Sequence, residues 1–285
     1  MKVFISNKEI QNQINNLHLT PLGFVPTMGA LHDGHISLVN KAISECPLVV
    51  VSIYVNPAQF NDRDDLRNYP RTPVADLGKL EMVLRDNDMV FTPDDKEIYP
   101  VADNRIFHFG NLDKVMEAHH RPGHFNGVAK VVSKLFDILQ PGIAYFGMKD
   151  FQQYAVIREL VRQKGYNIKI TGIPIIRESD GLAMSSRNRL LEPEIRKEAP
   201  VIYRTISTAS GLIKDHDIGY IKKFVTREIE KPAGFSVEYF EIVDDMELIP
   251  VQSKKEFTKG RQYYGCIAVK AGKIRLIDNI EFPLV

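Results

Sequence analysis

The chain has 285 residues, of which 44% are hydrophobic and 26% are charged, a composition typical of a globular protein. Lysine and arginine (37 residues) almost balance aspartate and glutamate (36), so the formal net charge is +1. A near-neutral chain lacks the broad positive field expected of a protein that binds nucleic acid. Its length is sufficient for one large α/β domain and a smaller second domain.

The N-terminal segment and the cysteines bear on where the protein works. Residues 1–16 are mixed and polar, without the apolar core of a signal peptide. No stretch approaches the roughly 20 consecutive apolar residues of a membrane span. Cys46 and Cys266 lie far apart in the sequence, and we expect two buried thiols without a disulfide. These features predict a cytoplasmic protein that does not contact a membrane.

Short apolar runs alternate with amphipathic stretches through the first 175 residues. Residues 48–55 are almost uninterruptedly apolar, as in a parallel strand that is covered on both faces. The alternation predicts a Rossmann-like, doubly wound parallel α/β sheet for residues 1–175. The pattern predicts strands at 22–26, 48–55, 88–92, 143–146 and 166–175, and helices at 34–45, 74–85, 128–139 and 151–162.

The pattern changes after residue 175. Residues 192–214 are expected to form one long helix, and residues 220–230 a second. Three β-rich runs then predict strands of an antiparallel sheet at 235–243, 263–270 and 273–277. Residues 176–285 are therefore predicted to form a second, smaller α+β domain.

The segment 26–35, PTMGALHDGH, follows the first of these strands and opens a helix. The N-terminus of a helix offers unpaired N–H groups and a favourable dipole to phosphate, and Gly29 and Gly34 permit a close approach. His32 and His35 are three residues apart, so they lie on one face of the first helical turn, where imidazoles can donate to phosphate oxygens. Two alternatives stay open: zinc ligands without an evident third partner, and histidines that only cap the helix.

Four later positions carry polar groups at the ends of strands or the beginnings of helices. Gln59, in NPAQF, suits a hydroxy acid beside an amine, unless it is the surface glutamine of a turn. Asp76 is either a magnesium ligand or a solvated carboxylate on a helix. Lys149, in FGMKD, begins a helix, where the dipole disfavours a cation unless an anion is bound. The segment 177–188, RESDGLAMSSRN, is either a phosphate clamp or a polar hinge.

These segments together resemble one enzyme family. His32-Asp33-Gly34-His35 resembles the HxGH variant of the HIGH motif of nucleotidyltransferases and class I aminoacyl-tRNA synthetases, and the surrounding PTMGALHDGHISLV is similar to the pantothenate synthetases in particular. NPAQF, DLRNYPRT, RPGHFNGV, FGMKDFQQ and the serine-containing segment match that family in the same order, and RLIDN at 275–279 is a weaker match. Lys130 departs from the family, which more often carries threonine there.

The resemblance implies a ligase of pantothenate and coenzyme A biosynthesis that joins pantoate to β-alanine. In the first half-reaction the carboxylate of pantoate attacks ATP, which gives pantoyl adenylate and pyrophosphate. In the second the amine of β-alanine attacks the adenylate and releases AMP. The family also implies a magnesium ion and a homodimer. Because pantoyl adenylate would be hydrolysed if water entered freely, we expect a closing lid, for which the loop at 184–188 and the C-terminal domain at 176–285 are the candidates.

The roles of individual residues follow from the matching motifs. Catalytic roles in stabilising phosphate charge are implied for His35, His32, Lys149, Ser185, Ser186 and Arg187. ATP contacts are implied for Met28, Gly29, Ala30, Leu31, His32, Asp33, Gly34, His35, Gly147, Met148, Lys149, Asp150, Ile176, Met184, Ser185, Ser186 and Arg187. Contacts with pantoate or β-alanine are implied for Pro26, Thr27, Met28, Gln59, Val131, Val132 and Gln153, and a magnesium contact for Asp76.

Three other functions compete with this interpretation. Another nucleotidyltransferase of the HIGH type would keep the HxGH and serine segments but has no reason to carry Gln59 and Gln153. A tRNA-charging enzyme is disfavoured by the neutral charge and by the lack of an anticodon-binding extension. A non-catalytic nucleotide sensor has no reason to keep His32, His35 and Lys149.

Overall fold

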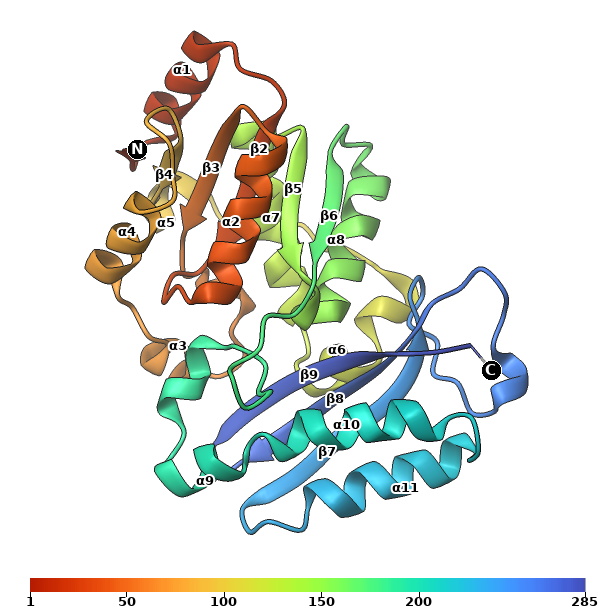
Figure 1. The fold of residues 1–285 in the computed structure, drawn as a ribbon. Coiled ribbons are helices and arrows are strands. Elements are labelled where there is room, and N and C mark those ends of the chain that lie inside the picture. Colours follow the sequence, from red (N-terminus) through yellow and green to blue (C-terminus); the bar gives the residue numbers. More distant parts are fainter. Residues whose placement is uncertain (285) are drawn as a thin grey trace. The chain divides into compact units, whose positions relative to one another are not determined.

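The computed structural model describes residues 1–284, which group into two units (Figure 1). Unit 1 comprises residues 1–109, 121–148 and 156–174. Unit 2 comprises residues 110–120, 149–155 and the chain from residue 175 onward. Two short internal segments thus belong with the C-terminal part of the chain, where the sequence suggested a single division after residue 175.

Within the described residues, unit 1 is built on a six-stranded parallel sheet in the order β1-β4-β3-β2-β5-β6. The chain moves outward from β2 through β3 to β4 on one side, and through β5 to β6 on the other. The topological switch therefore lies between β2 and β5, which are paired at Phe24 and Ala144. This confirms the Rossmann-like doubly wound sheet. The strands are β1 (Lys2–Phe4), β2 (Leu22–Thr27), β3 (Leu48–Ile53), β4 (Met89–Phe91), β5 (Ile143–Gly147) and β6 (Lys169–Ile173).

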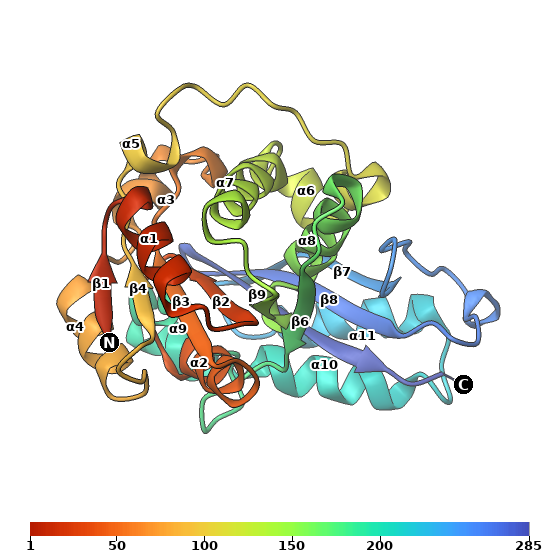
Figure 2. The same cartoon turned by 90° about the horizontal axis from the view of Figure 1, so that it is seen from above.

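Helices cover both faces of this sheet (Figure 2). Val25 of β2 packs in one core cluster with Leu38 of α2 and Leu80 of α4. Phe24, the preceding residue, points to the opposite face, where its ring meets that of Phe136 of α7 edge-on at 6.2 Å. The helices are α1 (Asn7–Leu17), α2 (Asp33–Glu45), α3 (Arg63–Asn68), α4 (Pro73–Glu81), α5 (Asp95–Ile98), α7 (His124–Leu139) and α8 (Phe151–Lys164), whose first turn belongs to unit 2.

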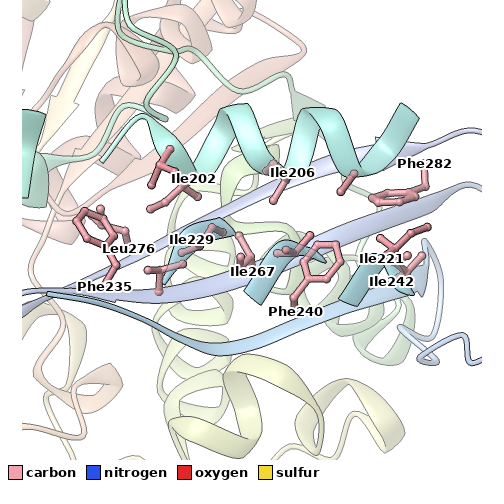
Figure 3. Close-up of a cluster of buried hydrophobic side chains, with 14 of the residues drawn as sticks. Ile202, Ile206, Ile221, Ile229, Phe235, Phe240, Ile242, Ile267, Leu276 and Phe282 are labelled. Atoms are coloured by element: carbon pink, nitrogen blue, oxygen red, sulfur yellow. The ribbon is translucent and has the colours of Figure 1, made fainter. Parts of the chain in front are cut away.

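Unit 2 contains, in the described part of the chain, a three-stranded antiparallel sheet in the order β7-β8-β9. The strands are β7 (Phe235–Asp244), β8 (Tyr263–Ala271) and β9 (Ile274–Phe282). Helices α10 (Val201–Leu212) and α11 (Ile218–Ile229) cover one face, where Ile206 and Ile221 join the core with Phe240 and Ile267 (Figure 3). This confirms the α+β character predicted for the C-terminal part.

The opposite face of the β7-β8-β9 sheet carries the short helix α6 (Met116–His120). Tyr239 directly precedes Phe240 in β7 and therefore points to this opposite face, where its hydroxyl donates to the Glu117 carboxylate at 2.7 Å. Arg275 of β9 also donates to that carboxylate through two nitrogens at 2.7 Å. These charged contacts explain why residues 110–120 belong to unit 2.

The single long helix predicted over residues 192–214 is wrong. The chain forms α9 (Pro193–Glu198) and α10, which are separated at Ala199 and Pro200. Pro200 has no N–H to donate to the preceding turn, so it begins a new helix more readily than it continues one. The helix predicted over 74–85 ends earlier, at Glu81, and the strand predicted over 166–175 begins later, at Lys169.

None of the helices described in residues 1–284 has the length and apolarity needed to span a bilayer.

Candidate active site

The turn between β2 and α2 lies at the switch point of the parallel sheet. Thr27 ends β2, where its hydroxyl donates to the carbonyl of Ser52 at 2.7 Å and accepts the N–H of Gly29 at 3.2 Å. Gly29 and Ala30 have left-handed φ angles of 79° and 49°. A Cβ on Gly29 would lie 3.0 Å from both Asp76 Oδ2 and a methyl group of Ile53, so the turn requires glycine here.

Helix α4 anchors this turn through Asp76, whose side chain is only 1% exposed. Its two carboxylate oxygens accept the N–H groups of Ala30 at 2.9 Å and Leu31 at 2.7 Å, and Thr72 donates its hydroxyl at 3.1 Å. One turn later, Lys79 donates to the carbonyl of Leu31 at 2.7 Å. Asp76 and Lys79 together therefore hold both polar groups of the Leu31 backbone.

These contacts do not suit the magnesium role expected for Asp76. Mg²⁺ keeps several waters in its coordination shell, whereas this carboxylate is buried and already accepts three donors. Among residues 1–284, no cluster of three or more His, Cys, Asp or Glu side chains has a geometry that could hold a metal ion. The magnesium contact of Asp76 stays a prediction without structural support, and the zinc alternative for His32 and His35 has no third ligand in the described chain.

His32 and His35 stand at the beginning of α2 with their ring centroids 4.1 Å apart. Nδ1 of His32 accepts the N–H of Gly34 at 3.1 Å, and Nδ1 of His35 accepts the N–H of His32 at 3.3 Å, which forms a reciprocal capping box. In a neutral imidazole whose Nδ1 accepts, the proton is assigned to Nε2, which makes that nitrogen the donor of the ring. Capping and phosphate binding are therefore compatible, since they use different nitrogens.

Gln59 ends the short 3₁₀ helix η1 (Pro57–Gln59) and is 8% exposed, so the alternative of a surface glutamine is wrong. Its Nε2 lies 3.0 Å from the sulfur of Met28, which follows β2. Its backbone carbonyl contacts Nδ1 of His124 at 2.7 Å, at the beginning of α7. The structure thus brings together two residues for which contacts with pantoate were predicted, Met28 and Gln59.

Asn56 is a residue of this region that the sequence did not single out. It is 1% exposed, donates to the carbonyl of Gly127 at 3.0 Å and to Gln59 Oε1 at 3.3 Å, and accepts the Tyr99 hydroxyl at 3.0 Å. A Cβ on Gly127 would overlap the backbone of Ala58 and Gln59, so glycine allows α7 to lie against η1. The available signal was the NPAQF motif, of which Asn56 is the first residue.

The other predicted phosphate ligands belong to unit 2. In the serine-containing segment, Met184 donates its N–H to the carbonyl of Ile176 at 3.0 Å, and Glu178 donates to Leu182 at 2.8 Å. These bonds form a small hairpin, which leads into the 3₁₀ helix η4 (Ser186–Leu190). The hydroxyl of Ser185 accepts the N–H of Arg187 at 3.3 Å and caps η4. The segment is therefore an ordered structure with defined hydrogen bonds.

The remaining predicted residues occupy ends of elements or buried positions. Pro26 lies in β2, Gly147 ends β5, Met148 begins the 3₁₀ helix η3 (Met148–Asp150), and Gln153 lies in the first turn of α8. Val131 and Val132 of α7 are buried, and Asp33 is exposed at the first position of α2. Their ligand contacts stay predictions.

Comparison with known proteins identifies the family to which the chain belongs. A family model described as pantoate-β-alanine ligase matches residues 2–281. The chain belongs to the pantoate-β-alanine ligase family. The resemblance found in the sequence is thereby confirmed.

Relatives within this ligase family match over nearly their whole length. The pantothenate synthetases of Bacteroides thetaiotaomicron and Phocaeicola vulgatus are 47% and 48% identical to the chain, with 99% of each chain covered. The pantothenate synthetase structure from Thermus thermophilus is 38% identical, with a TM-score of 0.90, and the match covers 99% of this chain and 100% of that one. The ligase from Francisella tularensis, complexed with β,γ ATP and β-alanine, is 34% identical, with a TM-score of 0.79, and 99% and 97% are covered.

Proposed function

We propose that this ligase condenses pantoate with β-alanine, converts ATP to AMP and pyrophosphate, and forms pantoyl adenylate as the intermediate. The observation that carries the proposal is the capped pair His32 and His35 at the switch point of the sheet, in a chain that matches the ligase family over residues 2–281. The relative from Francisella tularensis is complexed with β,γ ATP and β-alanine, which supports two of the three substrates in the proposal.

Adenylation requires the enzyme to align the pantoate carboxylate with ATP and to stabilise the charge that develops on the phosphate oxygens. A carboxylate such as that of pantoate is ionised at neutral pH, so it attacks phosphorus without a general base. The Nε2–H groups of His32 and His35 donate to phosphate oxygens on which charge develops, and the N-terminus of α2 adds its dipole. Gln59 and Met28, which are in contact, are proposed to bind pantoate and β-alanine.

Lys149, Ser185, Ser186 and Arg187 are proposed as further phosphate ligands. Lys149 lies in η3, directly before α8, where a cation is favoured only if an anion compensates the helix dipole. Mg²⁺ enters this proposal as part of the Mg-ATP substrate. Residues 176–285 are proposed to act as a lid that protects the adenylate from water. We also propose a cytoplasmic homodimer without nucleic-acid or membrane partners, which the family resemblance and the composition support.

The decisive experiment separates the two half-reactions. Purified protein is incubated with Mg-ATP and pantoate, with and without β-alanine, and pyrophosphate, AMP and pantothenate are followed by mass spectrometry. We expect enzyme-bound pantoyl adenylate without β-alanine, and pantothenate with AMP when it is added. If folded, ATP-binding protein releases no pyrophosphate in response to pantoate, the proposal fails and a nucleotidyltransferase acting on another acceptor becomes the better interpretation.

His35 provides a sharper test of the chemistry. His35→Gln keeps at the third helical position a side chain that can complete the capping box, but it removes the imidazole Nε2. We expect pantoate-dependent release of pyrophosphate to fall by about 100-fold or more, as for the loss of one charge-stabilising donor. Thermal unfolding should stay close to wild type.

Asn40→Ala, on the exposed side of the same helix, is the matched control for His35→Gln. The control should unfold and turn over like wild type. Unchanged turnover in His35→Gln would remove His35 from the mechanism.

A further inference from the structure

Two adjacent residues of β9, Asp278 and Asn279, contact both of the predicted phosphate-binding segments of unit 2. We propose that they are positioning residues, which hold the backbone at Lys149 and the hairpin that carries Ser185 in a fixed relation to each other. The inference rests on the proposed function, because it is that function which gives Lys149 and Ser185 their role.

Asp278 holds the side chain of Arg177, which is the first residue of the serine-containing segment. Its carboxylate, 4% exposed, accepts two bonds from the guanidinium of Arg177, at 2.7 and 3.0 Å. The same guanidinium lies 3.7 Å above the ring of Tyr203 and donates to the carbonyl of Gly181 at 3.2 Å. A planar group held by a carboxylate, a ring face and a carbonyl has little freedom to rotate.

Asn279 connects this anchor to Lys149. Its side-chain nitrogen donates to the backbone carbonyl of Lys149 at 3.1 Å, although the two residues are 130 positions apart. Its own N–H donates to Asp278 at 2.8 Å, and its carbonyl accepts from Arg177 at 3.4 Å. Asn279 is 5% exposed, so these bonds are shielded from water. The strand therefore touches Lys149 and Arg177 through consecutive residues.

The hairpin transmits the position of Arg177 to the serines. Asn188, which lies beyond Ser185 and is 8% exposed, donates to the carbonyl of Ala183 at 3.1 Å and to the Glu178 carboxylate at 3.2 Å. Glu178 is the neighbour of Arg177, so the end of the segment is tied back to its beginning. A shift of the Arg177 anchor would then move Ser185 with it.

Burial of such a pair is weak evidence for a contribution to stability. A buried ion pair often contributes no more than an apolar pair of similar volume, because desolvation offsets the attraction. A positional role gives the arrangement a different consequence, since a displacement of about 1 Å in a catalytic group can cost on the order of 100-fold in rate. The proposal therefore predicts that a variant of this pair loses more in kcat/KM for ATP than its loss of folding stability explains.

The first test compares two asparagines of unit 2 that both donate to backbone carbonyls. Asn279→Ala removes the bond to Lys149, and Asn111→Ala removes bonds to the carbonyls of Glu247 and Leu248, at 2.9 and 3.2 Å. We expect Asn279→Ala to lower kcat/KM for ATP in pantoate-dependent adenylation by about 10- to 100-fold. The KM for β-alanine should stay within about twofold of wild type.

Asn111→Ala should leave both quantities unchanged, whatever its effect on the melting temperature. If Asn279→Ala reacts like wild type, or if the two variants lose activity equally at an equal loss of Tm, the proposal is overturned. Absence of pantoate-dependent pyrophosphate release in wild type would instead defeat the proposed function, and the inference with it.

Asp278→Asn provides a second variant that keeps the shape of the side chain, in case Asn279→Ala does not fold. One oxygen still accepts from Arg177, but the charge that fixes the guanidinium is lost. We expect the KM for ATP to rise at least about fivefold while the KM for β-alanine stays unchanged. An equal rise of both constants, or no rise, would indicate a structural role only.

Discussion

In each unit, one predicted phosphate-binding segment is anchored by a buried aspartate, and the two aspartates have different kinds of partner. In unit 1, Asp76 accepts the backbone N–H groups of Ala30 and Leu31. In unit 2, Asp278 accepts the guanidinium of Arg177. A backbone N–H donor survives every substitution except that by proline. A guanidinium is lost in any substitution of the arginine, so the two anchors respond differently to mutation.

The partner also determines what each anchor fixes. Asp76 holds the main chain of a turn in which Gly29 and Ala30 have positive φ angles, and so it stabilises a backbone conformation directly. Asp278 holds a side chain, and the hairpin's own hydrogen bonds carry that position onward to Met184 and Ser185. Asp76 therefore determines the backbone conformation of its turn, whereas Asp278 determines the position of a hairpin that its own hydrogen bonds already shape.

The largest effect is expected when Asp278 loses its charged partner. Arg177→Met leaves a carboxylate that is 4% exposed without its guanidinium, and we expect the free energy of unfolding to fall by about 3–5 kcal/mol. Denaturant unfolding followed by circular dichroism measures the loss.

The double variant Arg177→Met with Asp278→Asn should recover part of this stability, because no buried charge then lacks a partner. A single-variant loss below about 1 kcal/mol would mean that the pair is solvated and that the contrast between the two anchors does not hold.

A smaller loss is expected at the other anchor. Asp76→Asn keeps one acceptor oxygen but turns an amide NH₂ toward the second backbone donor, so one buried N–H loses its partner at a cost of about 1–3 kcal/mol. The same variant tests the magnesium contact predicted for Asp76. If Asp76 is an anchor, the Mg²⁺ concentration that gives half-maximal activity should match that of wild type.

Glu81→Gln, an exposed carboxylate at the end of the same helix, is the control for Asp76→Asn. A rise of about tenfold or more in the Mg²⁺ requirement of Asp76→Asn alone would restore Asp76 as a magnesium ligand.

Much of the fold could be predicted because its signals are local. The apolar run of β3 and the helical spacing of α7 are visible in short windows, and the alternation of elements led to the correct sheet. β1 was missed because it has only three residues and two are exposed. The break at Pro200 was missed because the apolar spacing continues across it.

In the candidate site too, residues in local motifs could be predicted, and contacts between distant residues could not. His32, His35 and Gln59 could be selected because their residue types stand in contiguous motifs. The anchoring role of Asp76 and the contact of Asn279 with Lys149 depend on residues 45 and 130 positions away, and no local pattern reports such a pairing. Identity of the reactive groups is thus largely readable from the sequence, while the groups that hold them in place require the fold.

The smallest loss of stability is expected at another aspartate–arginine pair, in which the two partners are neighbours in the sequence. In unit 1, Asp103 accepts bonds from Nε of Arg105, two residues away, at 2.9 and 3.1 Å. These bonds from Arg105 lower the pKa of Asp103 to about 2 in the folded protein. The pKa in the unfolded chain is about 3.9, so the pair stabilises the fold above about pH 4 and the contribution is lost as the pH falls toward about 2.

Asp103→Asn should therefore cost about 1 kcal/mol or less at neutral pH, because the side chain of Arg105 is 36% exposed and its charge is screened by solvent. Urea midpoints of wild type and variant, measured from about pH 7 down to about pH 2.5, should converge in the acid range. A loss as large as that of Arg177→Met would show that sequence separation and burial do not distinguish the two ion pairs. A difference independent of pH would show that the Asp103 charge is not its source, and in either case the contrast would rest on Asp76 and Asp278 alone.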